Sequence, residues 1–201
     1  MTPPGTFERV YAAIKQRLRD GVYRPGDRLE PAALSDELNA SVTPVRDALH
    51  RLTGEHLVEA PRHEGFRVPM ITETMLRHLY AWHRDLLSIA IVNRWTEALP
   101  SCDESDASPE TEREKQRSLF FALAGLTGNP EHVHALQALS DRLEPVQRLE
   151  AALLDCVEEE TAQISAALRS GNRREIRRSL VRYHRRRERI VPELLERMHG
   201  R

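Results

Sequence analysis

The sequence lacks any apolar run long enough to cross a membrane, and it has only two cysteines among its 201 residues. A transmembrane helix needs about 18 to 20 consecutive apolar residues, so no membrane span is expected. Cys102 and Cys156 are too few for a disulfide framework and have no CxxC or Cys/His spacing suited to structural zinc. The first residues also lack the basic and apolar regions of a secretory signal. These absences predict a cytoplasmic protein in a reducing compartment.

Sequence motifs of enzyme chemistry are absent as well. We find no glycine-rich phosphate loop, no nucleophile elbow and no metal motif in the sequence. His132 and His134 are two residues apart, which places their imidazoles on different faces of a helix. A helical enzyme is therefore the least favoured of the functions considered, and we expect no cofactor.

Charge is unevenly distributed along the chain, although the net charge is only -1. Residues 1–69 contain 10 basic and 10 acidic residues, residues 70–168 contain 8 and 17, and residues 169–201 contain 12 and 4. The basic C-terminal stretch shares a helical pattern with apolar residues. We interpret it as a charged helix face that is balanced by the acidic residues 158–160. Phosphate binding by this stretch is the alternative.

Hydrophobic periodicity in the first 70 residues predicts three short helices followed by a hairpin. The first helix is expected over residues 6–20, the second from about Pro31 to the break at residues 39–41, and the third from that break to Gly54. Two strands are expected after them, over residues 57–60 and 66–68. Ser41 or Thr43 would be the N-cap of the third helix, and Pro44 would lie in its first turn. This order of elements predicts a winged helix-turn-helix domain over residues 1–70, whose third helix enters a DNA major groove.

The third predicted helix has two chemically different faces. Its apolar stripe consists of Val45, Ala48, Leu49 and Leu52. The opposite face would meet base edges, and it carries Val42, Thr43, Arg46, Asp47 and His50. Arg46 can bind guanine bidentately or grip phosphate, Thr43 can donate to phosphate or contact a thymine methyl, and Arg51 flanks the helix toward the DNA backbone. The alternative is an ordinary solvated face, because every amphipathic helix has one.

Helical periodicity continues through residues 71–201, which predicts an all-helical second domain and a mainly α protein. The expected helices run near residues 73–98, 111–127, 130–143, 146–170 and 173–198, and residues 100–109 are expected to form a polar loop. The aromatic residues Trp82, Trp95, Phe120 and Phe121 could line a cavity. Aromatic side chains at helical spacing are more often part of a core.

One stretch of the sequence resembles a known family of regulators. The run YRPGDRLEPAALSDELNASVTPVRDALHRLTGEHLVEAPRHEGFRV, with Ser41 to Leu49 reading SVTPVRDAL, resembles the GntR family of winged-helix repressors and especially its FadR-like branch. The resemblance covers residues 7–69 and is specific. It implies that Thr43 and Arg46 contact DNA, together with wing residues that include Arg62, His63 and Gly65.

This resemblance has one departure at the predicted DNA contact. Val42 stands where the family usually has arginine, and Ala32 and Ala33 lie in the second helix where an arginine often occurs. Each lost contact should cost about 1 to 3 kcal/mol at a matched base. DNA binding could therefore be weak, could favour an unusual operator with a thymine methyl against Val42, or could be lost. In the last case the chain would be a protein-interaction module.

The second half also resembles the helical C-terminal (FCD-type) domain of the same branch. That resemblance implies a bundle that dimerises and commonly binds a carboxylate effector over a metal held by one Asp and three His. Aligned on the Thr127-Gly128-Asn129 and Gly171-Asn172 breaks, the four ligand positions are Gln116, Phe120, Thr161 and Tyr183. None is a good ligand for a divalent metal, so we predict a metal-free domain.

His83 and Arg84 lie where the resemblance implies residues that face the effector cavity. His83 could serve a pocket, but a histidine on a half-apolar helix is more often a structural residue. The substituted ligand positions suggest an apolar effector, a filled pocket or no effector. The function predicted from the sequence is a homodimeric repressor that places two third helices in successive major grooves of a palindromic operator and occludes polymerase.

Overall fold

The chain divides into two compact units in a computed structural model that describes residues 5–92 and 111–200. One unit comprises Met1–Thr72 together with Glu196–Arg201, and the other comprises Glu73–Leu195. Each unit has its own architecture and its own buried residues. The assignment of separate functions to the two parts of the chain remains a prediction.

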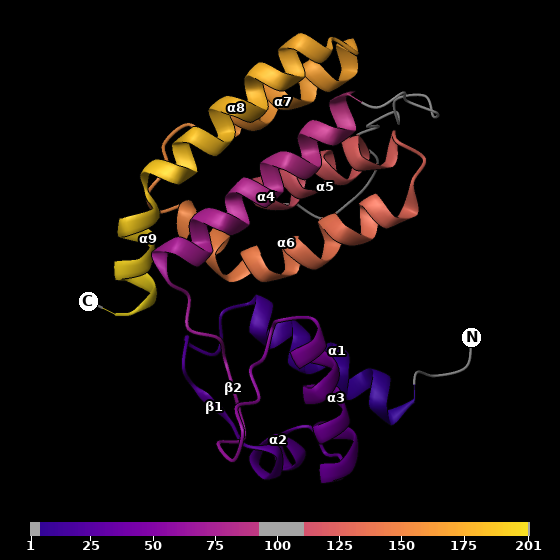
Figure 1. Cartoon of the computed structure of the whole chain (residues 1–201), viewed down its shortest axis with the longest axis vertical. Helices are drawn as coiled ribbons and strands as arrows, with labels where there is room; N and C mark the ends of the chain where they lie inside the picture. The colour runs from indigo at the N-terminus through magenta and orange to yellow at the C-terminus, as the bar shows by residue number, and fades with distance from the viewer. Residues whose placement is uncertain (1–4, 93–110, 201) are drawn as a thin grey trace. The chain divides into compact units, whose positions relative to one another are not determined.

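Three helices and a short two-stranded sheet make up the described part of the first 72 residues (Figure 1). In chain order the elements are α1 (Thr6–Arg19), β1 (Arg28–Leu29), α2 (Pro31–Glu37), α3 (Val42–Gly54) and β2 (Phe66–Arg67). Pro31 occupies the first turn of α2, where its missing N–H has no helical partner to lose. The bounds of the three helices agree with the sequence-based expectation to within a residue or two.

The apolar faces of these helices meet in one core. Val10 and Ile14 of α1 and Leu34 of α2 are buried against the stripe of α3, and Leu29 of β1 joins them. The α3 stripe is the predicted one: Val45, Ala48, Leu49 and Leu52, each fully buried. Burying a side chain of this size contributes about 1.5 to 3 kcal/mol, so the stripe fixes which side of α3 faces outward.

The sheet differs from the expected hairpin. β2 pairs antiparallel with β1, with Arg28 opposite Arg67 and Leu29 opposite Phe66. The strand expected over residues 57–60 is reduced to a single bridge, in which Glu59 exchanges backbone hydrogen bonds of 2.8 and 2.9 Å with Arg67. The consecutive residues 57 and 58 are both buried, so this segment does not alternate as a strand must.

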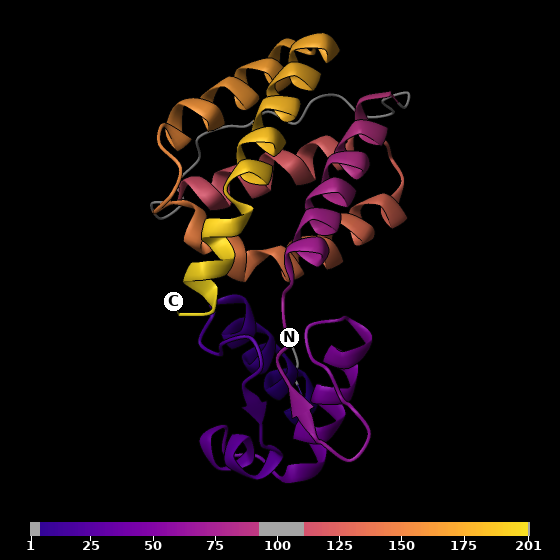
Figure 2. The same ribbon diagram turned by 60° about the vertical axis from the view of Figure 1, so that its left-hand side comes forward.

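The second unit is a bundle of helices, which Figure 2 shows from another side. The helices are α4 (Glu73–Val92), α5 (Glu112–Gly125), α6 (Pro130–Glu150), α7 (Val157–Ser170), α8 (Arg173–Arg189) and α9 (Val191–Met198), the last of which continues beyond residue 195. α4 packs against α5, α6 and α8, and α7 packs against α5 and α8. A capping box formed by Thr111 and Glu114 starts α5, and the Asn172 side chain caps α8.

Two predicted boundaries in this bundle are wrong. The helix expected over 130–143 continues through Pro145 to Glu150, and the helix expected over 146–170 begins only at Val157. Proline costs α6 one backbone hydrogen bond, but Leu143 and Val146 on either side of it are fully buried. Packing therefore outweighs the local signal for a break.

The helix expected over 173–198 is divided at Ile190 into α8 and α9. Pro192 explains the division, because it has no N–H to continue the α8 ladder and suits the first turn of a new helix. Two further expectations lie outside the described residues. They are the end of the helix expected to reach residue 98, which contains Trp95, and the loop expected over residues 100–109, which contains Cys102.

The fold is thus mainly α, with a winged helix-turn-helix of three helices and a small sheet followed by a helical bundle. Among the described helices none is both long enough and apolar enough to span a bilayer.

Candidate nucleic-acid interface and internal cavity

The outward side of α3 carries the residues that the sequence analysis selected. Val42, Thr43, Arg46 and His50 are all exposed, on the side opposite the buried stripe. Within the part of the chain that the structure describes, no hydrogen bond or ion pair engages the Arg46 guanidinium. An exposed arginine without an acidic partner keeps all five N–H donors available for a phosphate or a guanine edge.

The first turn of α3 is also open to an acceptor. Ser41 occupies the N-cap position, but its side chain makes no capping hydrogen bond, and Pro44 has no N–H. The N–H groups of the first turn have no partner inside a helix, and the helix dipole favours negative charge at this end. A phosphate beside Thr43 would meet both the free amides and the hydroxyl.

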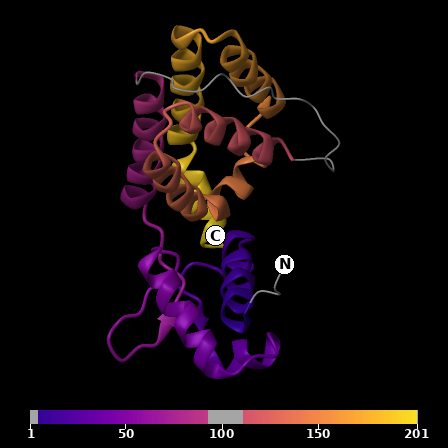
Figure 3. The ribbon, with the colours of Figure 1, turned by 90° about the vertical axis from the view of Figure 1, so that its right-hand side faces the viewer.

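The wing is the segment that leads from α3 to β2, and it projects from the helices in Figure 3. Its tip turns at Pro61, where the Glu64 N–H donates to the Pro61 carbonyl over 3.2 Å. Gly65 has a φ of 77°, which favours glycine, and His63 has a φ of 63°. Arg62, His63 and Gly65 are exposed. Arg67 is less available, because it pairs with Glu59 and Glu64 at 3.0 and 3.2 Å.

Two of the predicted contact residues have partners inside the N-terminal unit. The His50 ring packs edge-on against Phe66 with centroids 4.9 Å apart, which connects α3 to β2. The Arg51 guanidinium lies over the Tyr11 ring at 4.2 Å and within 3.5 Å of Glu55. Arg51 would have to leave these partners to reach a phosphate. A role for it in DNA contact stays a prediction.

Inside the second unit, the four positions assigned by resemblance come together. The Gln116 side-chain amide donates to the Thr161 hydroxyl over 2.9 Å, and Phe120 packs edge-on against Tyr183 with centroids 5.0 Å apart. All four side chains are buried. The four positions therefore lie together in one buried region of the bundle, and their role at an effector site stays a prediction.

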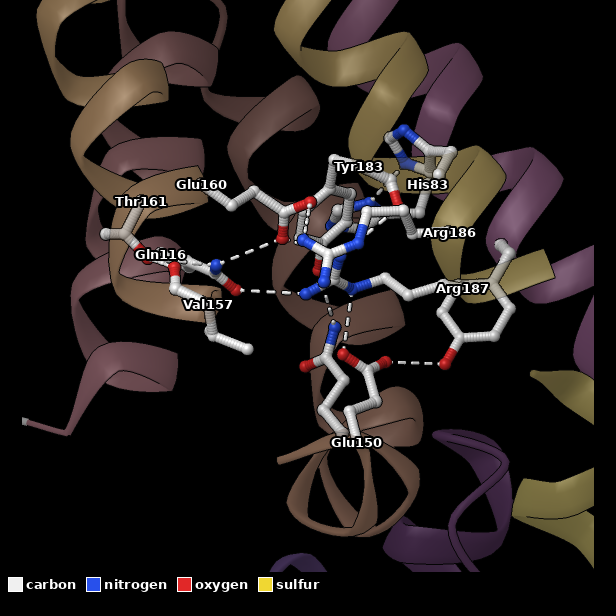
Figure 4. Close-up of polar contacts among 12 residues, drawn as sticks. His83, Gln116, Glu150, Val157, Glu160, Thr161, Tyr183, Arg186 and Arg187 are labelled. Carbon is white, nitrogen blue, oxygen red and sulfur yellow. Dashed lines mark hydrogen bonds and ion pairs between the residues drawn. The ribbon is translucent and has the colours of Figure 1, made fainter. Parts of the chain in front are cut away.

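A guanidinium occupies this region, as Figure 4 shows. Arg187 of α8 is 1% exposed, and its Nε and Nη1 atoms donate to Glu150 and Glu160 over 2.8 Å each. A further N–H lies 3.4 Å from the Gln116 carbonyl oxygen, and the guanidinium lies 3.4 Å from the Tyr183 ring centroid. Burial alone would lower the pKa of Arg187, but Glu150, Tyr183 and Glu160 together raise it, so the side chain stays charged.

These residues do not fit a divalent metal. Gln116, Phe120, Thr161 and Tyr183 offer no set of imidazole and carboxylate donors, and the two nearby carboxylates already pair with Arg187. Within residues 5–92 and 111–200, no group of three or more histidine, cysteine or acidic side chains is arranged to hold a metal ion.

His83 has a buried partner that the sequence did not reveal. Its Nδ1 lies 2.9 Å from Nε2 of His184, whose Nδ1 lies 2.7 Å from the Leu180 carbonyl. Because that carbonyl only accepts, His184 donates from Nδ1 and accepts at Nε2, so His83 is the donor between the rings. Burial lowers the pKa of His83 well below its usual value, aided by His184 and Arg187. Burial likewise lowers the pKa of His184 to about 4.

A cavity of about 210 Å³ lies beside this network. His83, Gln116, Phe120 and Tyr183 line it, together with Arg187. Thr161 does not line the cavity and instead accepts the Gln116 hydrogen bond. Arg84 lies outside it as well, because its guanidinium pairs with Glu188 over 3.0 Å. Of the six residues expected at an effector pocket, four therefore face this space.

Sequence reasoning missed the central residues of the network. Arg187 stands in the run RRRER, where its residue type does not distinguish it from the neighbouring arginines, and the sequence analysis assigns no role to Glu150. The hydroxyl of Tyr80 donates to Glu150 over 2.6 Å. One available signal was the position of Arg187 four residues after Tyr183, on the same buried face of α8.

Comparison with known proteins agrees with this geometry. Residues 6–68 match the family described as bacterial regulatory proteins, gntR family. The chain is 30% identical over 133 residues to the Nta operon transcriptional regulator of Aminobacter aminovorans, a match that covers 60% of this chain and 63% of that protein. It is 30% identical over 80 residues to the HTH-type transcriptional regulator McbR of Escherichia coli, covering 39% of this chain and 36% of McbR. The chain thus spans less than two thirds of the length of either relative.

Two solved structures share the fold across both units. E. coli McbR/YncC superposes with a TM-score of 0.68 at 21% identity, covering 94% of this chain and 98% of that chain. A GntR-type regulator from Rhodococcus sp. RHA1, named as putative, gives a TM-score of 0.68 at 18% identity, covering 93% and 97%. The relatives named here are transcriptional regulators rather than enzymes. Residues 6–68 therefore match the gntR family of bacterial regulatory proteins, in a chain that is similar to bacterial transcriptional regulators.

Proposed function

We propose that this chain is a sequence-specific DNA-binding transcription regulator of the FadR-like branch, acting in the cytoplasm as a homodimeric repressor with a metal-free effector domain. The observation that carries the proposal is the outward face of α3, where Arg46 is exposed, has no partner among the described residues and lies opposite a fully buried stripe. Such a helix is held rigidly and presents its donors to a groove.

In this function each part of the N-terminal unit has a separate role. Arg46 contacts a base edge or a phosphate, Thr43 and the first-turn amides hold the backbone, and the wing reaches the backbone or minor groove with Arg62. Val42 is 37% exposed and would favour a thymine methyl at its position. The operator read by this chain should therefore differ from one read by a relative with arginine there.

A palindromic operator requires two copies, and α4 offers a surface for pairing. Trp82, Ile89 and Val92 are exposed on this helix, at 48%, 45% and 73% respectively. Exposed apolar side chains that recur along one helix are typical of an interface between protein chains. We assign this surface to a second copy of the chain, in a two-fold dimer that presents two α3 helices.

The cavity of the second unit supports an effector role without metal. Arg187 supplies a fixed positive charge that is paired with Glu150 and Glu160. Amide, aromatic and imidazole groups line the space beside it, together with the charged residues Glu112, Arg113, Arg117 and Glu158. Such a lining suits a small, partly polar molecule. Its binding would alter the spacing of the two DNA-binding units and thereby relieve repression.

The second candidate function is a protein-interaction module that has lost its operator. The exposed Val42 favours it, because an apolar side chain replaces a groove-reading one at the start of α3. The two functions differ in their response to duplex DNA, so one titration separates them.

The test is binding of the purified chain to a duplex from upstream of its own gene, measured by fluorescence anisotropy across a salt series. Arg46→Ala should weaken binding by about 1 to 3 kcal/mol. Arg77→Ala is the matched control, because Arg77 is exposed but pairs with Glu73 on α4. Equal binding by the wild type and Arg46→Ala would remove Arg46 from the interface. A wild-type protein that binds no duplex at low salt would favour the interaction module.

A further inference from the structure

The outward side of α8 carries a long series of arginines that the bundle does not use. Besides Arg173, which donates to the Val92 carbonyl, the exposed arginines of α8 are Arg174, Arg177, Arg178, Arg182, Arg185 and Arg189. None of these six side chains has a hydrogen bond or ion pair within the residues that the structure describes. We call this surface the α8 arginine face. It extends over about 22 Å, at a rise of about 1.5 Å per residue.

The acidic residues that the sequence analysis paired with this helix do not neutralise it. Glu160 binds the half-buried Arg186 and the fully buried Arg187 over 3.1 and 2.8 Å. Glu158 and Glu159 form no ion pair with α8 among the described residues. Glu188 of α8 itself pairs with Arg84 of α4. The expectation of a balanced charged face is therefore wrong for the outward side of the helix.

Six unpaired positive charges on one helix repel one another, and each is strongly attracted to an anion. The residues that line this surface include a single apolar side chain, Val181. A protein interface is centred on apolar and aromatic groups and is depleted of charge at its core, so this face does not resemble one. A polymer with regularly repeated negative charges fits it better.

We propose that the α8 arginine face binds the phosphodiester backbone of duplex DNA without reading its sequence. Double-stranded DNA carries a charge about every 1.7 Å of its axis, so a surface about 22 Å long faces several phosphates at once. Guanidinium groups form charge-assisted, forked hydrogen bonds to phosphate. The proposal adds a second DNA contact to the proposed function but does not depend on α3.

The test compares two triple variants that remove the same charge from the same unit. The first variant removes three positive charges from the α8 arginine face by combining Arg178→Gln, Arg182→Gln and Arg185→Gln. The control combines Arg77→Gln, Arg84→Gln and Arg169→Gln, whose arginines contact Glu73, Glu188 and Ser165 and lie outside that face. Each protein is titrated with a labelled duplex of random sequence between about 50 and 200 mM salt.

The slope of log affinity against log salt concentration should be shallower by about 2 to 3 in the α8 glutamine variant. Each lost phosphate contact reduces this slope by about 0.9. The control variant should keep the wild-type slope. Replacing the same three α8 arginines with lysine should also keep it, because the charge is retained. Melting curves that match the wild type verify that all three variants are folded.

A wild-type slope in the α8 glutamine variant would overturn the proposal, and so would an equal loss in both glutamine variants. A change of oligomeric mass with no change in duplex binding would assign the face to a second copy of the chain and would also overturn it. Arg46→Ala, measured on the same random duplex and on the upstream duplex, separates the two proposals. It should mainly weaken the upstream duplex, whereas the α8 variant should weaken both.

Discussion

The two units of this chain place their polar groups in opposite locations. In the described part of the N-terminal unit the core is apolar and Ser35 is its one buried polar side chain, so Arg46, Thr43 and the wing face solvent. Among its described residues the C-terminal unit buries twelve polar or charged side chains: His83, Gln116, His132, Ser140, Asp141, Glu144, Glu150, Glu160, Thr161, Ser179, His184 and Arg187. The first unit has little beyond its surface to act with, whereas the second holds a charged network in its interior in addition to the exposed α8 arginine face.

This difference sets how each unit responds to substitution. An exposed side chain on α3 can change with little effect on stability, because surface substitutions usually remain within about 0.5 kcal/mol. A buried ion pair costs energy to assemble, and removing one member leaves the other buried without a partner. Substitutions on the exposed face of α3 should therefore change binding, and substitutions in the buried network of the second unit should change stability.

The largest expected effect comes from removing the buried guanidinium. Arg187→Met should lower the free energy of unfolding by about 3 to 5 kcal/mol, because Glu150 would remain buried without a cation and Glu160 would keep only Arg186. Chemical denaturation followed by tryptophan fluorescence measures this, since both tryptophans of the chain, Trp82 and Trp95, belong to the C-terminal unit.

The matched control for that experiment is Arg182→Met, an exposed position on the same helix. It should change the stability by no more than about 0.5 kcal/mol. Equal losses for the two variants would mean that the interior network contributes nothing specific, and the contrast between the units would fail.

Acid should destabilise the C-terminal unit through its buried histidines. Burial depresses the pKa of His83 and of His184, the latter to about 4, so the folded state holds both rings neutral. The unfolded chain takes up these protons near pH 6.5, so the stabilisation is complete above that pH and is lost as the pH falls toward 4. Each histidine contributes a slope of up to about 1.4 kcal/mol per pH unit.

Unfolding measured between pH 7 and pH 5 checks this expectation. His184→Gln should show a shallower slope than the wild type, because one buried imidazole has been removed. His63→Gln at the exposed wing tip is the control and should keep the wild-type slope. A wild-type stability that does not change over this range would contradict the assignment of neutral, buried rings.

The smallest effect is expected at the surface of α3. Val42→Arg should leave the melting temperature almost unchanged, since the side chain is exposed. It should add one phosphate or base contact, which steepens the salt dependence of duplex binding by about 0.9 if the contact is to phosphate. If Val42→Arg binds the upstream duplex more weakly but binds duplexes of other sequence more strongly, Val42 itself reads a base. A large loss of stability would contradict the view of α3 as a freely variable surface.

The sequence was sufficient for the three helices of the N-terminal unit because their signals are local. The stripe of Val45, Ala48, Leu49 and Leu52 recurs at helical spacing, so the face of α3 follows from periodicity alone. The strand β1 was missed because it is only two residues long and follows a Pro-Gly turn. Its pairing with β2 depends on a contact across about 40 residues, which no local pattern records.

The interior of the C-terminal unit could not be predicted, because its partners are distant in the sequence. Arg187 meets Glu160, Glu150 and Gln116 at separations of 27, 37 and 71 residues. The family resemblance selected Gln116 and Tyr183, which contact Arg187, but it did not point to the arginine itself. The continuation of α6 past Pro145 was missed for a related reason, since tertiary packing outweighs a local helix breaker.

Hydrogen–deuterium exchange of the full chain, with and without the upstream duplex, tests the central claim most directly. The first-turn amides of α3 lack helical partners and should exchange quickly in the free protein, as should the exposed wing tip at residues 62–65. The account predicts that both segments become protected on binding, while the buried segment around Gln116 and Phe120 changes little. Unchanged exchange at the start of α3 in the presence of saturating duplex would contradict it.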